Sequence, residues 1–390
     1  MRVSTLFDDV VRSDTGPAAY AEPSFPYWNR TARADIERVR YELEQWFARY
    51  PPSSAPDLRA RVRSSNDVQH QGAFFELFLH ELLLRKDASV DPHPAVLGTT
   101  KRPEFDVTPV DGASFYLEAK VATDESSTEA SARQRANMVY DAINDLASPD
   151  FWINVEVEGA PNSLVPTRKL KTFVEKCLSG ADYDDVATKY ERSGLAELPR
   201  WRYEHDGWIV DFFPIPKQKA RGRGGTRPMG LQMPGPKWVD PVSPLRDAIL
   251  QKAKRYGTPD KPYVIAINAL SEWLESDQIV EALFGDEEWV SRFPEDELRF
   301  RRKRNGVWTS SSGTYTRVSA VMVFQKLHPW SFPAAAVRLY HHPQAQRPLN
   351  DGPLMALPQA RVTGDELILT DGESIGDVFG LSADWLAELR

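Results

Sequence analysis

One short stretch, residues 103–120, limits the folds open to this chain, because apolar and polar residues alternate on both sides of a turn. Before the turn, the apolar residues are Phe105 and Val107. After it, every second residue is apolar: Phe115, Leu117, Ala119 and Val121. A period of two is typical of β-strands with one buried face. The stretch therefore predicts a β-hairpin that covers a core.

The polar face of this hairpin carries two carboxylates and a lysine. If both apolar faces cover one core, then Asp106 shares a face with Glu118 and Lys120. A three-residue loop over 111–113, or an equivalent bulge, meets this condition by pairing Asp106 with Glu118. A two-residue Asp111-Gly112 turn would put the apolar sets on opposite sides. We therefore predict that the Asp-Gly signal is not a two-residue turn.

The overall composition excludes several classes of protein. A chain of 390 residues can bury a large core, and two or three domains are expected. The formal net charge of −8 argues against a protein that coats nucleic acid, although a local basic groove remains open. A single cysteine, Cys177, excludes a disulfide framework and a cysteine-rich zinc site. With no signal peptide and no long apolar run, we expect a cytoplasmic protein without a membrane span.

The elements around the hairpin follow a definite order. A helix is predicted over 31–50, and Pro51-Pro52 ends it. The next elements are a helix over 69–86, a strand over 89–96, the hairpin, a helix over 127–146 and a strand over 151–157. The order α-β-β-β-α-β with a mixed sheet predicts a self-contained α/β fold.

The rest of the chain divides less clearly. Further elements are predicted as a helix over 167–179, a strand over 207–214, a long loop over 216–241, a helix over 244–256 and a strand over 262–268. The last two could extend the first sheet. We expect three regions, namely an N-terminal arm with a helix (1–65), the α/β core with its extension (66–270) and an accessory α+β region (271–390).

The order of elements and two short motifs resemble the PD-(D/E)xK nuclease superfamily. The motifs are Pro103-Glu104-Phe105-Asp106 on the first strand of the hairpin and Glu118-Ala119-Lys120 on the second. The resemblance covers about residues 66–160 and implies a restriction-endonuclease-like fold. In the family the proline directly precedes the aspartate, whereas Pro103 lies three residues before Asp106. Glu104 shares the face of Asp106 and is a candidate substitute for it.

The resemblance also implies roles for individual residues. Asp106 would be the central metal ligand and Glu118 the second ligand. Lys120 would orient or deprotonate the attacking water, or stabilise charge on the phosphate. Glu76, from the preceding helix, would be an auxiliary ligand or hold the water. The implied cofactor is Mg²⁺ or Mn²⁺.

The physical chemistry of these residues supports the same site. Carboxylates bind hard divalent cations, which neutralise a phosphate and activate water for phosphodiester hydrolysis. Asp106, Glu118 and Lys120 could instead be a solvated face with a surface ion pair, which is common and contributes little. Glu76 favours the functional interpretation, because its neighbours Phe74, Phe75 and Leu77–Leu79 are apolar and a buried carboxylate needs a partner.

Histidines outside the motif are interpreted as structural. His80 lies one turn from Glu76 and could orient it or bind metal, but a satisfied core histidine is the favoured interpretation. His93, His341 and His342 lie near prolines and are also expected to be structural.

Two basic segments could contact a phosphate backbone, since local clusters of Lys and Arg attract polyanions. The first lies in the glycine-rich loop: Lys217, Lys219, Arg221, Arg223 and Arg227. The second is denser: Arg299, Arg301, Arg302, Lys303 and Arg304. The second could equally be a solvated face that pairs with the acidic residues at 295–297.

Together these features predict a cytoplasmic, Mg²⁺-dependent phosphodiesterase that cleaves nucleic acid. The resemblance favours DNA as substrate, endonuclease over exonuclease, and a role in defence against foreign DNA. The alternatives are an RNA nuclease with the same site, an inactive nucleic-acid-binding or scaffold protein of this fold, and a hydrolase of another phosphate ester. Region 271–390 is a candidate for DNA recognition, for a homodimer contact or for a partner protein.

Overall fold

The computed structural model describes residues 5–96, 99–218, 221–222, 227–231, 240–290, 299–309, 315–364 and 366–389. The chain forms two compact units. The first contains Met1–Gly16, Pro23–Asp124 and Val239–Arg390. The second contains Pro17–Glu22 and Glu125–Trp238. Among the described helices, none combines the length and apolar character that crossing a membrane requires.

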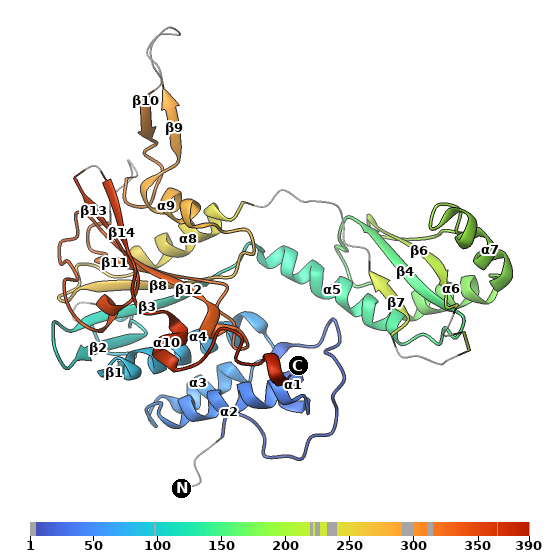
Figure 1. Cartoon of the computed structure of the whole chain (residues 1–390), viewed down its shortest axis with the longest axis horizontal. Coiled ribbons are helices and arrows are strands. Elements are labelled where there is room, and N and C mark those ends of the chain that lie inside the picture. Colours follow the sequence, from blue (N-terminus) through green and yellow to red (C-terminus); the bar gives the residue numbers. More distant parts are fainter. Residues whose placement is uncertain are drawn as a thin grey trace. The chain divides into compact units, whose positions relative to one another are not determined.

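An eight-stranded mixed sheet forms the centre of the first unit, with the order β1-β2-β3-β8-β11-β12-β13-β14 (Figure 1). Its strands are β1 (Ala88–Pro92), β2 (Phe105–Pro109), β3 (Phe115–Ala122), β8 (Tyr263–Ala269), β11 (Ala320–Gln325), β12 (Ala336–His341), β13 (Gln359–Thr363) and β14 (Glu366–Thr370). β8 lies parallel to both β3 and β11, whereas β2 pairs antiparallel with both β1 and β3. The expectation of an α/β fold with a mixed sheet is confirmed.

Helices cover both faces of this sheet because its strands alternate between two apolar clusters. Phe115 and Leu117 of β3 pack in one cluster with the buried apolar residues of α4. Tyr116 packs in the other cluster, with the buried apolar residues of α8 and α9. The helices are α1 (Ser24–Arg30), α2 (Ala34–Ala48), α3 (Ala55–Val62), α4 (Asp67–Arg85), α8 (Val242–Ala253), α9 (Ser276–Phe284) and α10 (Ile375–Phe379). The side chain of Asn66 caps α4 by accepting from the backbone N–H groups of Val68 and Gln69.

The hairpin of β2 and β3 confirms part of its prediction and corrects the rest. Asp106 lies opposite Tyr116, so it shares a face with Glu118 and Lys120 as expected, and the two-residue turn is excluded. The predicted pairing of Asp106 with Glu118 is wrong, because the register is shifted by two residues. The same register continued by one residue places Glu104 opposite Glu118.

A contact that is distant in sequence holds the turn of this hairpin. The backbone N–H of Ala113 donates to Asp351 Oδ1 at 3.0 Å. Gly112 has φ +108°, and a Cβ there would lie 2.7 Å from the same oxygen. A residue with a side chain would be both strained and obstructed at this position. The Asp111-Gly112 dipeptide therefore lies in a turn that packs against the segment after β12. Local turn preferences could not reveal this long-range contact.

The second unit has its own four-stranded sheet, with the order β5-β6-β4-β7. Its elements are α5 (Ser127–Asn144), β4 (Phe151–Glu158), α6 (Thr167–Ser179), α7 (Tyr183–Ser193), β5 (Trp201–His205), β6 (Trp208–Pro216) and β7 (Met229–Leu231). β4 was predicted to complete the core sheet, and this is wrong. β8 lies beside β3 instead. This agrees with the prediction that the strand over residues 262–268 could extend the first sheet.

The two units also differ from the three predicted regions. The apolar residues of α2 and α3 pack in the same cluster as α4, so residues 1–65 are not a separate arm. β11 to β14 continue the sheet of β3 and β8, so residues 271–390 are not a separate accessory region. In chain order the first unit reads α4-β1-β2-β3-α8-β8, with residues 125–238 inserted between β3 and α8.

The remaining elements of the first unit are short. β9 (Glu287–Val290) and β10 (Arg299–Arg302) form a separate antiparallel pair (Figure 1). Three short 3₁₀ segments, η1 (Phe332–Ala334), η2 (Pro353–Ala356) and η3 (Ala387–Leu389), complete the described elements.

Candidate functional site

Glu118 lies in the middle of a charged network where β3 meets the end of α8. Its side chain is fully buried. Glu118 Oε1 accepts from Lys252 Nζ at 2.5 Å and from Arg255 Nη1 at 2.6 Å. Tyr256 donates its hydroxyl to Oε2 at 2.7 Å. Two cations and a phenol therefore compensate this buried carboxylate.

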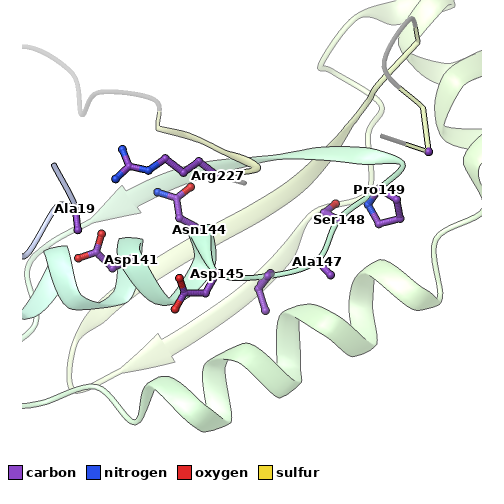
Figure 2. Close-up of a pocket in the computed structure, with 10 residues that line it drawn as sticks. Ala19, Asp141, Asn144, Asp145, Ala147, Ser148, Pro149 and Arg227 are labelled. Carbon is purple, nitrogen blue, oxygen red and sulfur yellow. The ribbon is translucent and has the colours of Figure 1, made fainter. Parts of the chain in front are cut away.

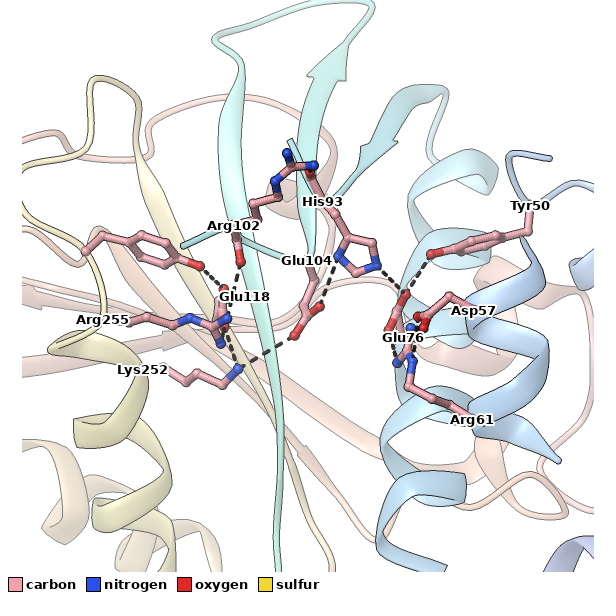
Figure 3. Close-up of polar contacts among 11 residues, drawn as sticks. Tyr50, Asp57, Arg61, Glu76, His93, Arg102, Glu104, Glu118, Lys252 and Arg255 are labelled. Atoms are coloured by element: carbon pink, nitrogen blue, oxygen red, sulfur yellow. Dashed lines mark hydrogen bonds and ion pairs between the residues drawn. The ribbon is translucent and has the colours of Figure 1, made fainter. Parts of the chain in front are cut away.

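Glu104, the residue before β2, extends the network (Figure 3). Its Oε1 lies 3.6 Å from Lys252 Nζ, and its Oε2 lies 3.6 Å from His93 Nδ1. Burial raises the pKa of Glu104 to about 7, and the nearby carboxylates of Glu76 and Glu118 add to the rise. Glu104 thus lies where negative charge is crowded.

Glu76 approaches the same place from α4. Its carboxylate accepts from the Tyr50 hydroxyl at 2.6 Å and from Arg61 Nη1 at 2.6 Å. Burial raises the pKa of Tyr50, and Glu76 raises it further, so Tyr50 is a neutral donor. Glu76 is 2 % exposed. The expected partner of this buried carboxylate therefore exists, and it is Arg61 of α3.

His93 joins the two halves of the network. Its Nε2 lies 3.5 Å from Glu76 Oε1, and its Nδ1 faces Glu104. The residue has φ +53°, which is uncommon for a residue with a side chain, and its N–H donates to the carbonyl of Glu104. Glu76, His93 and Glu104 each place one ligand atom within 4.8 Å of the others. His93 was interpreted as structural, and only its flanking prolines hinted at a constrained backbone.

Asp106 has a different environment. Its Oδ2 pairs with Lys261 Nζ at 2.5 Å, whereas Oδ1 is buried without a hydrogen-bond partner. Asp106 is outside the Glu76–His93–Glu104 group, which is the one set of converging acidic and histidine ligands among the described residues. The candidate carboxylates were Asp106 on β2 and Glu104 just before it. The structure places Glu104, and not Asp106, in the group with Glu76.

Lys120 lies on the same face as Glu118, two residues further along β3. Its side chain is half-buried, and among the described residues it forms no ion pair. Burial lowers the pKa of Lys120, and the charge of Lys252 adds to this effect. The amine is therefore available to a ligand.

The basic residues described in the predicted loop of the second unit are engaged within that unit. Lys217 is buried and donates to the carbonyl of Ser148 at 2.6 Å, with its Nζ over the Trp152 ring. Arg221 stacks on Tyr183 and pairs with Asp150. Arg227 donates to the carbonyl of Ala18 at 2.7 Å. Lys219 and Arg223 lie outside the described residues.

The second basic segment, 299–304, belongs to the β9–β10 pair. Arg301 pairs with Glu288 at 2.6 Å and Arg302 with Glu287 at 2.5 Å across the two strands. Lys303 lies 3.8 Å from Asp286, and Arg304 is exposed. The alternative of an ion-paired face is thus realised for Arg301 and Arg302, with partners on β9. The side chain of Arg299 and the predicted partners at 295–297 lie outside the described residues.

The other histidines have structural environments. His80 is buried against Tyr50, and burial lowers its pKa to about 4. His341 Nε2 lies 2.5 Å from Gln359 Oε1, and His342 Nδ1 accepts from the N–H of Gln344.

A hollow of about 750 Å³ lies within the second unit, beside the end of α5 (Figure 2). The carboxylate of Asp141, which lines the hollow, accepts from the backbone N–H groups of Tyr20 and Ala21. Arg227, also in the lining, donates to the carbonyl of Ala18. Its polar groups therefore fasten residues 17–22 to the unit, and it contains none of the predicted metal ligands.

Comparison with known proteins gives no family for the chain. No family model matches the sequence, and neither the search of curated proteins nor the search of solved structures returns a significant match.

The raised pKa of Glu104 predicts how stability changes with pH. Between about pH 4.5 and pH 7, folded Glu104 holds a proton that the unfolded chain has released, so the free energy of unfolding falls as pH rises through this range. Glu104→Gln removes this contribution. We expect the wild type to lose stability relative to Glu104→Gln between pH 5.5 and pH 8, as measured by urea unfolding in EDTA. Parallel pH dependence of the two proteins would contradict the assignment.

Proposed function

We propose that the protein is a metal-dependent nuclease that hydrolyses phosphodiester bonds, with DNA as the favoured substrate. One observation carries the proposal: Glu76, His93 and Glu104 converge within 4.8 Å, and Lys120 on β3 forms no ion pair among the described residues. A divalent ion held by such ligands would neutralise a phosphate and activate water, and a lysine amine can assist the proton transfer.

The order of elements supports the same conclusion. In the first unit, α4-β1-β2-β3-α8-β8 has the α-β-β-β-α-β order of the PD-(D/E)xK nucleases once the inserted second unit is set aside. Under this alignment, Pro103-Glu104 replaces the Pro-Asp of the motif, and Glu118-Ala119-Lys120 supplies its Glu-x-Lys. Glu104 then takes the central role that was expected of Asp106, and its proline directly precedes it.

The donor set suits a first-row divalent ion with mixed oxygen and nitrogen preference. Two carboxylates and one imidazole favour Mn²⁺ over Mg²⁺, because Mg²⁺ prefers oxygen ligands alone. When bound, such an ion would neutralise a phosphate and acidify water. Burial, together with the crowded carboxylates, raises the pKa of Glu104 to about 7, which fits a site that gains by acquiring positive charge.

The residues of the chain have distinct roles in this proposal. Glu76, His93 and Glu104 supply ligands, and Arg61 and Tyr50 orient Glu76 through its two oxygens. Lys120 contacts the attacking water or a phosphate oxygen, and burial lowers its pKa, which favours a role in proton transfer. Glu118 holds Lys252 of α8 and Arg255, which follows α8, in place.

A second candidate is a nucleic-acid-binding protein of the same fold without catalysis. The compensation of Glu118 by Lys252 and Arg255, and of Glu76 by Arg61, favours it, because buried carboxylates with such partners need no metal ion. This protein would bind nucleic acid without cleaving it in the presence of Mn²⁺.

Lys120→Ala tests the catalytic proposal. Wild type should cleave plasmid, linear DNA or RNA with Mn²⁺ and less well with Mg²⁺, and Lys120→Ala should reduce the rate by about 100-fold or more, since it removes a proton-transfer or charge-stabilising group. Nicking of closed circular plasmid, without shortening of linear DNA from its ends, would identify an endonuclease.

The matched control for this experiment is Lys326→Ala, which removes a half-exposed lysine that pairs with Glu272 on the surface. It should cleave as fast as the wild type. Equal cutting by Lys120→Ala would indicate a contaminant, and binding without cutting by the wild type would favour the second candidate.

A further inference from the structure

The cations beside Glu118 exceed what the neighbouring carboxylates require. Lys252 and Arg255 both direct their donors at Glu118 Oε1, although Tyr256 also donates to this carboxylate. Lys120 stands on the same strand face with no ion-pair partner among the described residues. Lys252 and Arg255 thus face Glu118, and Lys120 is close enough to Lys252 for that charge to lower its pKa, so three cations stand against the two carboxylates Glu118 and Glu104.

Part of this charge is open to a ligand. Arg255 is about one-third exposed, with 35 % of its side chain accessible. Its Nη1 binds Glu118, while its Nη2 reaches, within the part of the chain that the structure describes, only the carbonyl of Arg102 at the long distance of 3.5 Å. A guanidinium with one nitrogen on a carboxylate and the other weakly engaged can still bind an anion.

The position of these cations is fixed by the fold around them. Tyr263 donates its hydroxyl to the carbonyl of Lys252 at 3.0 Å, and Arg317 donates to the carbonyl of Tyr256 at 2.6 Å. Tyr256 and Tyr263 pack edge to face, with ring centroids 5.4 Å apart. The end of α8 and the residues after it are therefore held before any ligand binds, which reduces the entropy cost of binding.

We propose that Lys120, Lys252 and Arg255 form a subsite for one phosphate group of the substrate, next to the Glu76–His93–Glu104 cluster. Glu118 is the internal counter-ion of Lys252 and Arg255, and the phosphate competes with Glu118 for these two cations. In this arrangement carboxylates and His93 form the α4 side of the site, while the phosphate lies on the α8 side. The subsite deepens the proposed nuclease function, but its anion binding needs no metal ion.

Metal-free protein in EDTA allows a direct test. Isothermal titration calorimetry with inorganic phosphate should show saturable binding to the wild type. Arg255→Ala should weaken it about tenfold or more, the range for losing a charge-assisted hydrogen bond. Lys254→Ala is the matched control, because Lys254 is an exposed neighbour directed at the Tyr315 ring, and it should bind as the wild type does.

Glu118→Gln gives a result that misfolding could not produce. Removing the counter-ion should free Lys252 and Arg255 and tighten phosphate binding several-fold. Short single-stranded DNA with and without a 5′-phosphate then distinguishes the source of the phosphate: equal affinity indicates an internal phosphodiester, and a requirement for the 5′-phosphate indicates a chain end.

The outcomes separate this subsite from the nuclease proposal. Equal phosphate affinity of Arg255→Ala and Lys254→Ala, or no saturable binding by the wild type, overturns the subsite even if Glu104-dependent cleavage occurs. Conversely, Arg255-dependent phosphate binding without metal-dependent cleavage upholds the subsite and refutes the nuclease.

Discussion

Glu104→Gln should reduce nuclease activity by about 100- to 1,000-fold, whereas Asp106→Asn should retain most of it. Glu104 converges with Glu76 and His93, and amide replacement removes its charge while keeping its shape. Asp106 pairs with Lys261 outside this group. The measurement is the initial rate of DNA cleavage at saturating Mn²⁺, with Mn²⁺ affinity determined separately by calorimetry.

This pair of variants is its own control, because both replace a partly buried carboxylate by an amide within three residues. Both should unfold at similar urea concentrations. If Asp106→Asn abolished cleavage while Glu104→Gln did not, the motif would be centred on Asp106, as the resemblance to the nuclease superfamily implies. Loss of Mn²⁺ binding in Glu104→Gln without loss in Asp106→Asn would locate the metal site independently of activity.

Arg61→Ala should lower the free energy of unfolding by about 3 kcal/mol, because it leaves the buried carboxylate of Glu76 without its cation. Glu76 is 2 % exposed, and the Tyr50 hydroxyl would be its strongest remaining donor. Glu76→Gln in the Arg61→Ala background should recover much of the loss, since no uncompensated charge remains. Urea unfolding in EDTA measures both effects.

Arg38→Ala provides the comparison for Arg61→Ala. Arg38 pairs with Glu42 at 3.0 Å along α2, and because the Arg38 side chain is 43 % exposed, such an i,i+4 pair contributes about 0.5 kcal/mol. Addition of Mn²⁺ should restore part of the stability of Arg61→Ala, because an ion bound near Glu76 supplies positive charge to the folded state. An effect of Arg61→Ala as small as that of Arg38→Ala would mean that Arg61 does not compensate Glu76.

The site shows which inferences a local pattern can support. Alternation along residues 103–121 placed Asp106, Glu118 and Lys120 on one face, and the structure confirms this because side-chain direction depends only on parity within a strand. Parity does not determine register, and a shift of two residues exchanges Asp106 for Glu104 opposite Glu118. Asp351, which fastens the turn, lies more than 200 residues away in sequence.

The apolar surroundings of Glu76 predicted that it would have a partner, and this too is confirmed. The identity of the partner was beyond reach, since Arg61 and Tyr50 meet Glu76 through the packing of α3 and the end of α2 on α4. His93 was missed for a similar reason. Its functional placement depends on a left-handed backbone conformation that turns the ring between two carboxylates.

Residues 103–121 by themselves determined a hairpin with one apolar and one charged face, because both properties follow from neighbours within a few residues. The tertiary structure alone decided that β8 rather than β4 stands beside β3, and that Lys252 and Arg255 reach Glu118 across an insertion of more than 100 residues. Sheet partners and buried ion pairs are chosen by the packing of the whole first unit. The charged face thus came from local sequence, and the groups that complete it came from the fold.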